Sequence, residues 1–173
     1  EFARRGLKRK GLELLGVIPH QPILTRPSVE LIREELKAEI LNRPDQIQNL
    51  VDDVVVGAMC VQNAITSFHR GVRLIASSDR EELILAAATT LFSQNEGLAG
   101  IVLTGHVQPS ASLLKVIHQM RFPVLLASED SYDVASRVHD LIVKTRPNET
   151  QKISLIRDLV ARYVDVNRIV KSL

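Results

Sequence analysis

A polar segment that directly follows an apolar run is the part of the chain best suited to bind a charged group. The run Gly71–Ala76 leads into Ser77-Ser-Asp-Arg-Glu-Glu82, and a later run ends in Leu103-Thr-Gly-His106. In an open parallel sheet, ligands bind outside the carboxyl ends of the strands, where helix N-termini present unpaired N–H groups. The spacing therefore predicts a polar site where these runs end.

Arg80 is the residue of this segment that requires a partner. Ser78 and Glu81 have the spacing of a capping box, and Asp79 in the first helical turn suits the helix dipole, so capping alone explains these three side chains. A cation at a helix N-terminus is disfavoured by roughly a few tenths of a kcal/mol unless it is paired. We expect Arg80 to bind either a protein carboxylate, within the chain or in a second copy, or the anion of a ligand.

Four expected strand ends contribute to the candidate polar site. Gly57 and Gly105 would allow a tight turn or a close approach of the backbone to another group, because no side chain stands in the way. His106 could serve as an acid, a base or a ligand. The candidate residues for a ligand site or an intersubunit polar network are Gly57, Ser78, Asp79, Arg80, Thr104, Gly105, His106, Glu129 and Asp130.

The chain has no recognisable catalytic or metal-binding pattern. Its five histidines are scattered, and no second His or Cys lies at metal-ligand spacing from His106. The paired acids Asp52-Asp53 and Glu129-Asp130 do not indicate a catalytic dyad, because adjacent strand residues point to opposite faces and adjacent loop acids are usually solvated. No P-loop, dinucleotide-binding or nucleophile-elbow pattern occurs. We expect no catalytic residue, no metal and no cofactor, and no enzyme.

A repeated unit positions these residues. From Leu50 onward, an apolar run of four to seven residues is followed four times by a longer helical pattern. Strands of nearly continuous Val, Ile and Leu that alternate with helices indicate a parallel sheet. The expected strand and helix pairs are 53–58 with 61–70, 72–76 with 79–93, 101–104 with 110–120, and 123–127 with 131–144. The predicted fold class is α/β, a parallel β-sheet flanked by helices with a long C-terminal helix.

Two further segments flank the repeats. The run 12–18 suggests a strand, and a helix begins after Ser28, so residues 1–45 are expected to be a connector or the tail of an upstream domain. Residues 46–148 form the predicted main domain. Residues 149–173 carry one long apolar stripe at helical spacing, which predicts a final amphipathic helix that packs on its own sheet or on another subunit.

The helix expected at 79–93 has almost no polar face. Such a helix is enclosed all round, either by the rest of its own chain or by a second subunit. Its candidate dimer-interface residues are Leu83, Ile84, Ala87 and Leu91.

Composition limits the class of partner. The chain of 173 residues is 45% hydrophobic, and no apolar run approaches the ~20 residues of a membrane span, so a cytoplasmic location without a membrane partner is expected. Five basic residues lie within residues 1–10 of a chain whose net charge is +2. Nucleic acid is not an expected partner, because the chain lacks Trp and its aromatic content of 3% provides no stacking platform for bases.

The order of several motifs resembles the DRTGG domain over about residues 45 to 145. The motifs are Val54-Val-Val-Gly-Ala-Met59, Phe68-x-x-Gly71, Ser78-Asp-Arg-Glu-Glu82, Ile84-Leu-Ala-Ala87, Ala99-Gly-Ile-Val-Leu-Thr-Gly105, Pro123-Val-Leu-Leu126 and Asp130-Ser-Tyr132. Domains of this kind occur beside CBS pairs in inorganic pyrophosphatases and in long bacterial phosphate acetyltransferases. The resemblance implies an α/β fold, frequent dimerisation and a regulatory role.

The segment Gly11–Leu36 looks like the tail of a dethiobiotin-synthetase-like P-loop domain, so the chain resembles the C-terminal part of a P-loop plus DRTGG protein of the phosphotransacetylase-like family. The sequence departs from the DRTGG pattern at two places. Glu81-Glu82 stands where the name motif has Thr-Gly-Gly, and His106 stands where relatives often have a second Gly. The resemblance therefore extends to Asp79, Arg80, Thr104 and Gly105 as organisers of the strand-end surface.

Three functions remain open at this point. The first is a non-enzymatic regulatory and homodimerisation domain of a phosphotransacetylase-like protein with an upstream P-loop domain. The second is a sensor that binds a nucleotide or phosphate metabolite at the strand ends. The third is a part of a phosphate acetyltransferase.

Overall fold

The computed structural model describes residues 2–90, 98–105 and 107–171. The chain divides into two compact units. The sheet unit consists of residues 26–143, and the terminal unit consists of residues 1–25 together with 144–173. The sheet unit therefore begins at Arg26, whereas the predicted main domain began at residue 46.

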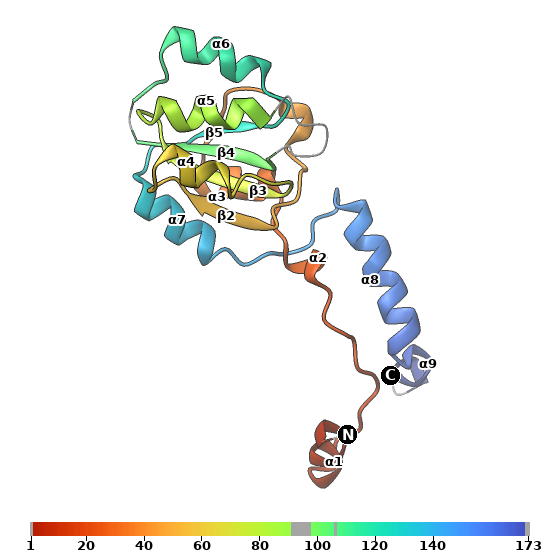
Figure 1. Ribbon diagram of the computed structural model, residues 1–173. Coiled ribbons are helices and arrows are strands. Elements are labelled where there is room, and N and C mark those ends of the chain that lie inside the picture. Colours follow the sequence, from red (N-terminus) through yellow and green to blue (C-terminus); the bar gives the residue numbers. More distant parts are fainter. Residues whose placement is uncertain (1, 91–97, 106, 172–173) are drawn as a thin grey trace. The chain divides into compact units, whose positions relative to one another are not determined.

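Within the described residues, five strands form a mixed sheet in the order β1-β5-β4-β3-β2 (Figure 1). The strands are β1 (Glu39–Ile40), β2 (Asp53–Val56), β3 (Val72–Ser77), β4 (Gly100–Thr104) and β5 (Val124–Leu126). Strands β2 to β5 are parallel, as the repeated pattern predicted, and the short edge strand β1 runs antiparallel to β5. The predicted α/β class is confirmed. Strand β1 was not predicted, because its two residues are too few to show a strand pattern in the sequence.

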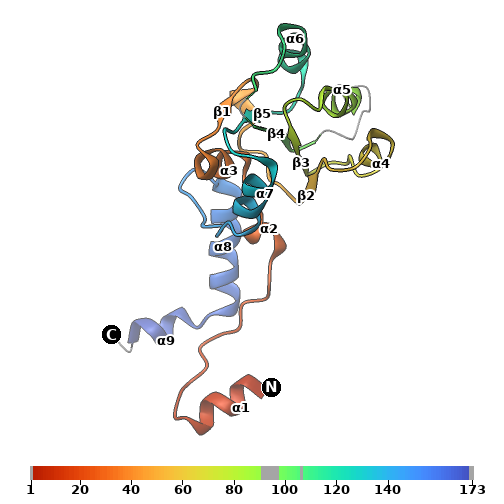
Figure 2. The ribbon, with the colours of Figure 1, turned by 90° about the vertical axis from the view of Figure 1, so that its left-hand side faces the viewer.

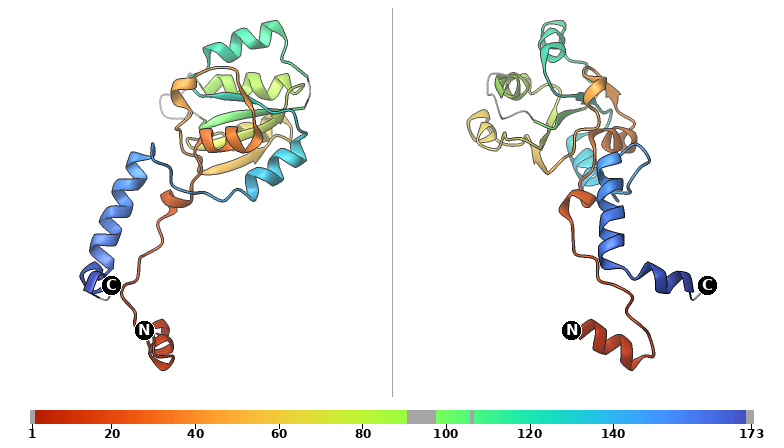
Figure 3. Two further views of the ribbon diagram at one scale, coloured as in Figure 1. Left: turned by 180° about the vertical axis from the view of Figure 1, so that it is seen from behind. Right: turned by 90° about the vertical axis from the view of Figure 1, so that its right-hand side faces the viewer.

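Helices cover both faces of this sheet. They are α3 (Val29–Leu36), the 3-10 turn η1 (Pro44–Gln46), α4 (Val61–Ile65), α5 (Glu81–Thr89), α6 (Ala111–Gln119) and α7 (Ser131–His139). Figure 2 shows α4, α5 and α6 on one side of the sheet and α3 and α7 on the other. The left view of Figure 3 shows the molecule from behind, with α3 in front of the strands. Val72 and Leu74 of β3 point to the first group, whereas Ile75 points to the second, as the alternation of a strand requires.

Side-chain caps define where three of the helices begin. The Ser28 Oγ accepts from the Leu31 N–H at 3.2 Å, which confirms the start predicted for α3. Ser110 caps α6 in the same way, and Asp130 Oδ1 accepts from the N–H groups of the second and third residues of α7. Each cap satisfies a donor that the helix itself cannot pair.

The early start of the sheet unit follows from the packing of α3. Val29, Ile32 and Leu36 are buried in the core under β3, β4 and β5. The side chain of Asn42, just after β1, lies in the interior and bonds three backbone groups there. Its Nδ2 donates to the Ile117 carbonyl at 2.6 Å and its Oδ1 accepts from the Val124 N–H at 2.7 Å, while the Phe122 carbonyl accepts a longer bond. Residues 26–45 thus pack within the sheet unit.

Strand β2 forms one edge of the described sheet. The N–H of Gly57, which follows β2 directly, donates to the Ile75 carbonyl of β3 at 2.7 Å. Because the backbone groups of successive strand residues point to opposite sides, those of Val54 and Val56 point away from β3. The Val54 N–H is bonded by the Asp53 carboxylate at 2.8 Å, and the Val56 carbonyl accepts from the Ala58 N–H at 2.8 Å. The Val54 N–H and the Val56 carbonyl therefore already have partners within the chain.

The terminal unit contains α1 (Phe2–Arg9), α2 (Pro22–Thr25), α8 (Thr150–Tyr163) and α9 (Val166–Lys171). The described part of the segment 149–173, predicted as one final helix, contains two helices, because Val164 leaves the helical path to form a β-bridge with Gly16. The strand predicted at 12–18 is likewise reduced to that bridge and a bond from the Asp165 N–H to the Leu15 carbonyl. Among the helices of the described residues, none is long and apolar enough to cross a membrane.

Candidate functional site

Arg80 closes the loop between β2 and α4. Its Nη1 donates to the Gly57 carbonyl and its Nη2 to the Met59 carbonyl, both at 3.0 Å. Its Nε lies 2.5 Å from Glu82 Oε1. In the single chain, Arg80 thus contacts two backbone carbonyls and one carboxylate.

The predicted capping box at the start of α5 does not form. Helix α5 begins at Glu81 with Arg80 as its N-cap residue, and no side chain caps it. The reason is that the chain continues the sheet for longer than expected, since the Ser78 N–H donates to the Thr104 carbonyl at 3.0 Å. Ser78 is buried in that position, and Asp79 precedes the helix instead of standing in its first turn.

Glu82 is held by the same arginine. The hydrogen bond from Arg80 is the main cause that lowers the pKa of the Glu82 carboxyl, and a bond from its own backbone N–H acts in the same direction. The side chain of Glu82 is half exposed, so this pair lies at the surface. It orients the guanidinium toward the carbonyls of the β2–α4 loop.

Hydrogen bonds join the loops that follow β4 and β5, close to the contacts of Arg80. Thr104 Oγ1 lies 2.6 Å from Ser131 Oγ, at the start of α7. The Gly105 N–H donates to the Glu129 carbonyl at 2.8 Å, and its φ of +91° is a conformation that favours glycine. His106, the remaining candidate of this loop, lies outside the described residues.

Glu129 and Asp130 have structural partners. Glu129 Oε1 is 2.5 Å from Arg137 Nη1, and Arg137 also pairs with Glu35 of α3 at 3.3 Å. Asp130 is the N-cap of α7. Through the ion pairs of Arg137 and the cap by Asp130, these contacts connect α7 to the end of β5 and to α3, and they stabilise the fold.

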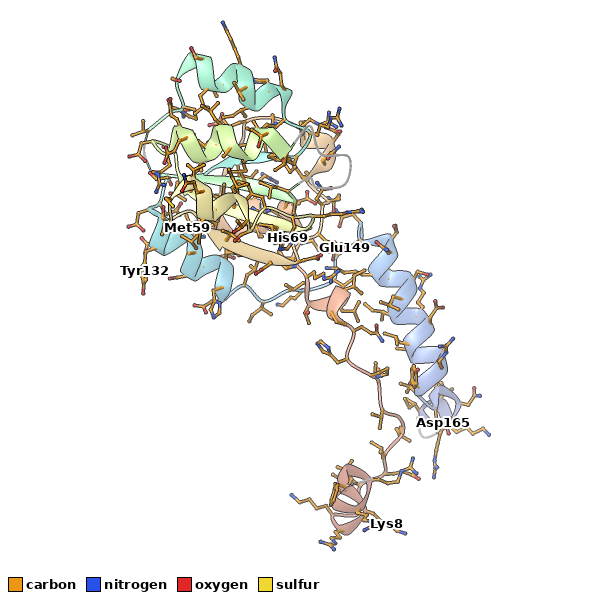
Figure 4. The ribbon with its side chains drawn as sticks, in the orientation of Figure 1. Lys8, Met59, His69, Tyr132, Glu149 and Asp165 are labelled. Atoms are coloured by element: carbon orange, nitrogen blue, oxygen red, sulfur yellow. The ribbon has the colours of Figure 1, made fainter. Side chains whose placement is uncertain are left out.

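Gly57 is required by packing. A Cβ on Gly57 would lie 2.8 Å from Leu83 Cδ1 and 3.3 Å from Ala76 Cβ. The strand-end loop can approach α5 closely only without a side chain at this position. Figure 4 places Met59 and Tyr132 near the carboxyl ends of the parallel strands and His69 near their amino ends.

The strand ends thus lie side by side as predicted, but their electrostatics are mostly acidic. Asp79, Glu81, Glu82, Glu129 and Asp130 are accompanied by two cations, Arg80 and Arg137. Both cations have carboxylate partners. Across the described part of the chain, no group of three or more His, Cys, Asp or Glu side chains is placed to hold a metal ion.

Comparison with known proteins assigns the family. The model of the DRTGG domain matches residues 31–141, which is more than half of the chain. The chain belongs to the DRTGG domain family. The family match begins inside α3, in agreement with a sheet unit that starts well before residue 46.

This DRTGG domain is similar to parts of longer proteins. It is 29% identical to the phosphate acetyltransferase of Pseudomonas putida over 92% of the chain and 23% of that protein. It is 26% identical to the phosphate acetyltransferase of Nitratidesulfovibrio vulgaris over 86% of the chain and 22% of that protein. The chain spans about a quarter of the length of the curated relatives it matches.

A solved structure shares the fold. It contains the CBS and DRTGG domains of the regulatory region of Clostridium perfringens pyrophosphatase, in complex with its activator, diadenosine tetraphosphate. The TM-score is 0.55 at 19% sequence identity, over 86% of this chain and 61% of that chain.

The predicted dimer-interface residues of α5 are placed inside this DRTGG domain. Leu83, Ile84 and Ala87 are fully buried against the sheet and the neighbouring helices α4 and α6. Their burial in the single chain corresponds to the alternative of an internally covered helix. The fourth candidate, Leu91, lies outside the described residues.

Arg73 is the residue that sequence reasoning missed. It lies in β3 between Val72 and Leu74 and is fully buried, and among the described residues none of its three guanidinium nitrogens has a hydrogen-bond partner. Burial lowers the pKa of the Arg73 guanidinium to about 9. One signal was present, namely a cation inside an otherwise apolar parallel strand, where both faces are expected to be buried.

Proposed function

We propose that this DRTGG domain is a regulatory and self-associating domain of a phosphotransacetylase-like protein and has no catalytic activity of its own. The observation that carries the proposal is the use of Arg80. The guanidinium in the name motif is directed to the Gly57 and Met59 carbonyls and to Glu82, so its charge stabilises the fold. An upstream P-loop domain in the full-length protein belongs to the same proposal.

The similarity to phosphate acetyltransferases supports this role. The relatives carry this region as about a quarter of their length, which leaves the larger part of each protein for other domains. Acetyl-phosphate formation from acetyl-CoA and phosphate by the purified chain tests the point directly. We expect no activity above a heat-treated control, and turnover proportional to protein concentration would contradict the proposal.

Self-association would use exposed apolar side chains at the strand-end edge. Met59, Val107 and Tyr132 are large hydrophobic residues that are exposed in the single chain, with Tyr132 79% exposed. Aromatic residues and Met are enriched in protein interfaces, and an exposed apolar cluster at a polar rim marks such surfaces. The acidic residues of this edge would form the rim.

Light scattering coupled to size-exclusion chromatography tests this part. We expect a dimer at micromolar concentration and a shift to monomer in Tyr132→Ser. Ile142→Ser is the matched control, because Ile142 is similarly exposed but follows the other end of α7. A monomeric wild type, or equal effects of the two substitutions, would count against homodimerisation through this edge.

A ligand sensor is the second candidate. A Cβ on Gly105 would meet, among the described residues other than its chain neighbour Thr104, the hydroxyls of Ser77 and Ser78 alone, each at 4.0 Å. This position lies at the carboxyl ends of two parallel strands, the usual place for ligands in such sheets. Two hydroxyl groups of this kind can bond a phosphate or a ribose.

Thermal-shift measurements with nucleotides, diadenosine tetraphosphate and acetyl phosphate test the sensor. A ligand at one hundred times its dissociation constant stabilises the folded chain by about 2.7 kcal/mol. Ser78→Ala should abolish the shift, whereas Ser112→Ala, on the exposed side of α6, should leave it unchanged. A flat response to every compound would refute this candidate without touching the first.

A further inference from the structure

The buried guanidinium of Arg73 requires a counter-ion. Taking a charge out of water costs free energy that only a partner or hydrogen bonds can offset, and residues 2–90, 98–105 and 107–171 supply neither to the three nitrogens of Arg73. Position 73 faces the layer of α3 and α7, because it alternates with Val72 and Leu74, which face the other layer. The counter-ion must therefore be reached from the α3 and α7 side of β3.

The carboxylate of Asp52 lies beside the chain two residues before Arg73. The Asp52 N–H donates to the Gly71 carbonyl at 2.8 Å. Its Oδ2 lies only 2.5 Å from the position that a Cβ on Gly71 would take. Two residues of strand span about 7 Å, a distance that an extended arginine side chain can cover.

Asp52 is held by another arginine in this arrangement. Its Oδ1 lies 2.9 Å from Arg26 Nε, and both side chains are 39% exposed. Surface ion pairs of this kind contribute little to stability and are easily exchanged. Arg26 is the first residue of the sheet unit, directly after Thr25, which ends the N-terminal part of the terminal unit.

The neighbouring acid Asp53 does not offer the same possibility. Its Oδ1 accepts from the Val54 N–H at 2.8 Å, which turns the carboxylate toward the edge of the sheet. Asp140, at the end of α7, is exposed and belongs to the helix that packs on β3. It is the natural comparison for Asp52.

We propose that Asp52 is a shared counter-ion, which pairs with Arg26 in the present arrangement and turns to the buried Arg73 when Arg26 is drawn away. Arg26 and Arg73 then compete for the carboxylate of Asp52. Displacement of the chain at residues 25–26 would break the ion pair of Asp52 with Arg26 and allow Asp52 to pair with Arg73, which lies beneath α3 and α7. This exchange does not depend on the regulatory role proposed above.

A double-mutant cycle in the full chain tests the exchange, with urea unfolding as the readout. In the wild type, Asp52→Asn should change the unfolding equilibrium constant by less than about threefold, with or without Arg73→Met. In the Arg26→Ala background, Asp52→Asn should lower stability by at least about tenfold, and Arg73→Met should remove that loss. Arg73→Gln replaces Arg73→Met in the cycle if the latter does not fold.

Three results would overturn the proposal. The first is an absence of coupling between positions 52 and 73 in the Arg26→Ala background. The second is coupling of Arg73 to the control substitution Asp140→Asn in place of Asp52→Asn. The third is stabilisation of the wild type, but not of Arg73→Met, by sodium phosphate relative to sodium chloride at equal ionic strength, since an external anion would then be the counter-ion.

Discussion

The Nη1 group of Arg80 donates to the carbonyl of Gly57 at 3.0 Å, across 23 residues of sequence. This bond and its neighbour to Met59 join the start of α5 to the loop that follows β2. The unfavourable position of a cation at a helix N-terminus is thereby offset by acceptors on another element. Arg80 acts as a clamp of the strand-end surface.

Removal of the clamp should loosen the β2–α4 loop. Arg80→Ala leaves the Gly57 and Met59 carbonyls without their donors, and we expect a loss of about 1–3 kcal/mol in the free energy of unfolding. Urea denaturation measures the loss, and hydrogen exchange should rise at residues 57–60. Glu82→Gln is the control and should cost much less than Arg80→Ala, because it removes only the exposed ion pair. Equal losses would show that the carbonyl bonds contribute nothing.

The Arg80–Glu82 pair should be sensitive to acid. The pKa of Glu82 is lowered in the folded state, so the unfolded state binds more protons as the pH falls through the carboxyl range. The pair therefore stabilises the fold above the unfolded pKa and is lost as the pH falls through the lower, folded pKa. The stability difference between the wild type and Glu82→Gln, measured by urea unfolding at a series of pH values, should decrease on acidification. A difference that is constant with pH would contradict this linkage.

Asn42 should be among the most sensitive polar residues of the domain. Its side chain satisfies buried backbone groups of Ile117 and Val124, together with the Phe122 carbonyl. Asn42→Ala leaves them unpaired, and we expect a loss of about 3 kcal/mol by thermal or urea unfolding. Asn49→Ala removes a single long bond of 3.4 Å and should cost less than about 1 kcal/mol. Similar costs for the two variants would mean that water replaces the Asn42 amide.

The two glycines of the strand ends should respond to substitution for different reasons. Gly57→Ala forces a methyl group against Leu83 and should cost about 1–3 kcal/mol through overpacking. Gly105→Ala makes no contact closer than 4.0 Å with the described residues beyond its chain neighbours, and it should cost about 1–2 kcal/mol through the positive φ. The double variant Gly57→Ala with Leu83→Val should recover part of the first loss, because the shorter side chain makes room. No recovery would assign the cost to the backbone.

Arg73 should make stability rise in alkaline solution. Below pH 9 the folded chain carries the cost of a buried charge, and Arg73→Met should be the more stable protein. Above about pH 9 the folded state releases the proton while the unfolded state keeps it, so the wild type gains stability as the pH rises. The difference between the two proteins, followed by urea unfolding from pH 7 to 10.5, should narrow. A wild type that is more stable than Arg73→Met at pH 7 would show that the charge is already paired.

Local patterns in the sequence were sufficient for the main elements. The cap at Ser28 and the apolar runs around Val72 and Val102 located α3, β3 and β4, because caps and buried strands leave signals within a few residues. The start of α5 was misplaced because the Ser78 N–H bonds Thr104, a strand neighbour that the local pattern around Ser78 does not contain.

The contacts of the candidate site depended on distant residues. The carbonyl partners of Arg80 lie on another loop, and a carbonyl carries no side-chain signature that sequence reasoning can use. The apolar helix α5 raised two alternatives, and only the positions of α4 and α6 decide that Leu83 faces its own chain. In the terminal unit, Gly16 interrupts the last helix through Val164, which the apolar stripe could not reveal.

The protected edge of β2 has a consequence for how copies of this domain can assemble. An open strand with free N–H and C=O groups is a template for further strands and for fibrous aggregation. The Asp53 carboxylate and the Ala58 N–H occupy the Val54 N–H and the Val56 carbonyl, so addition of a strand along β2 would first have to break these two bonds. Association through side chains elsewhere leaves the β2 bonds intact, and it gives a closed dimer where the same patch of both copies meets about a two-fold axis.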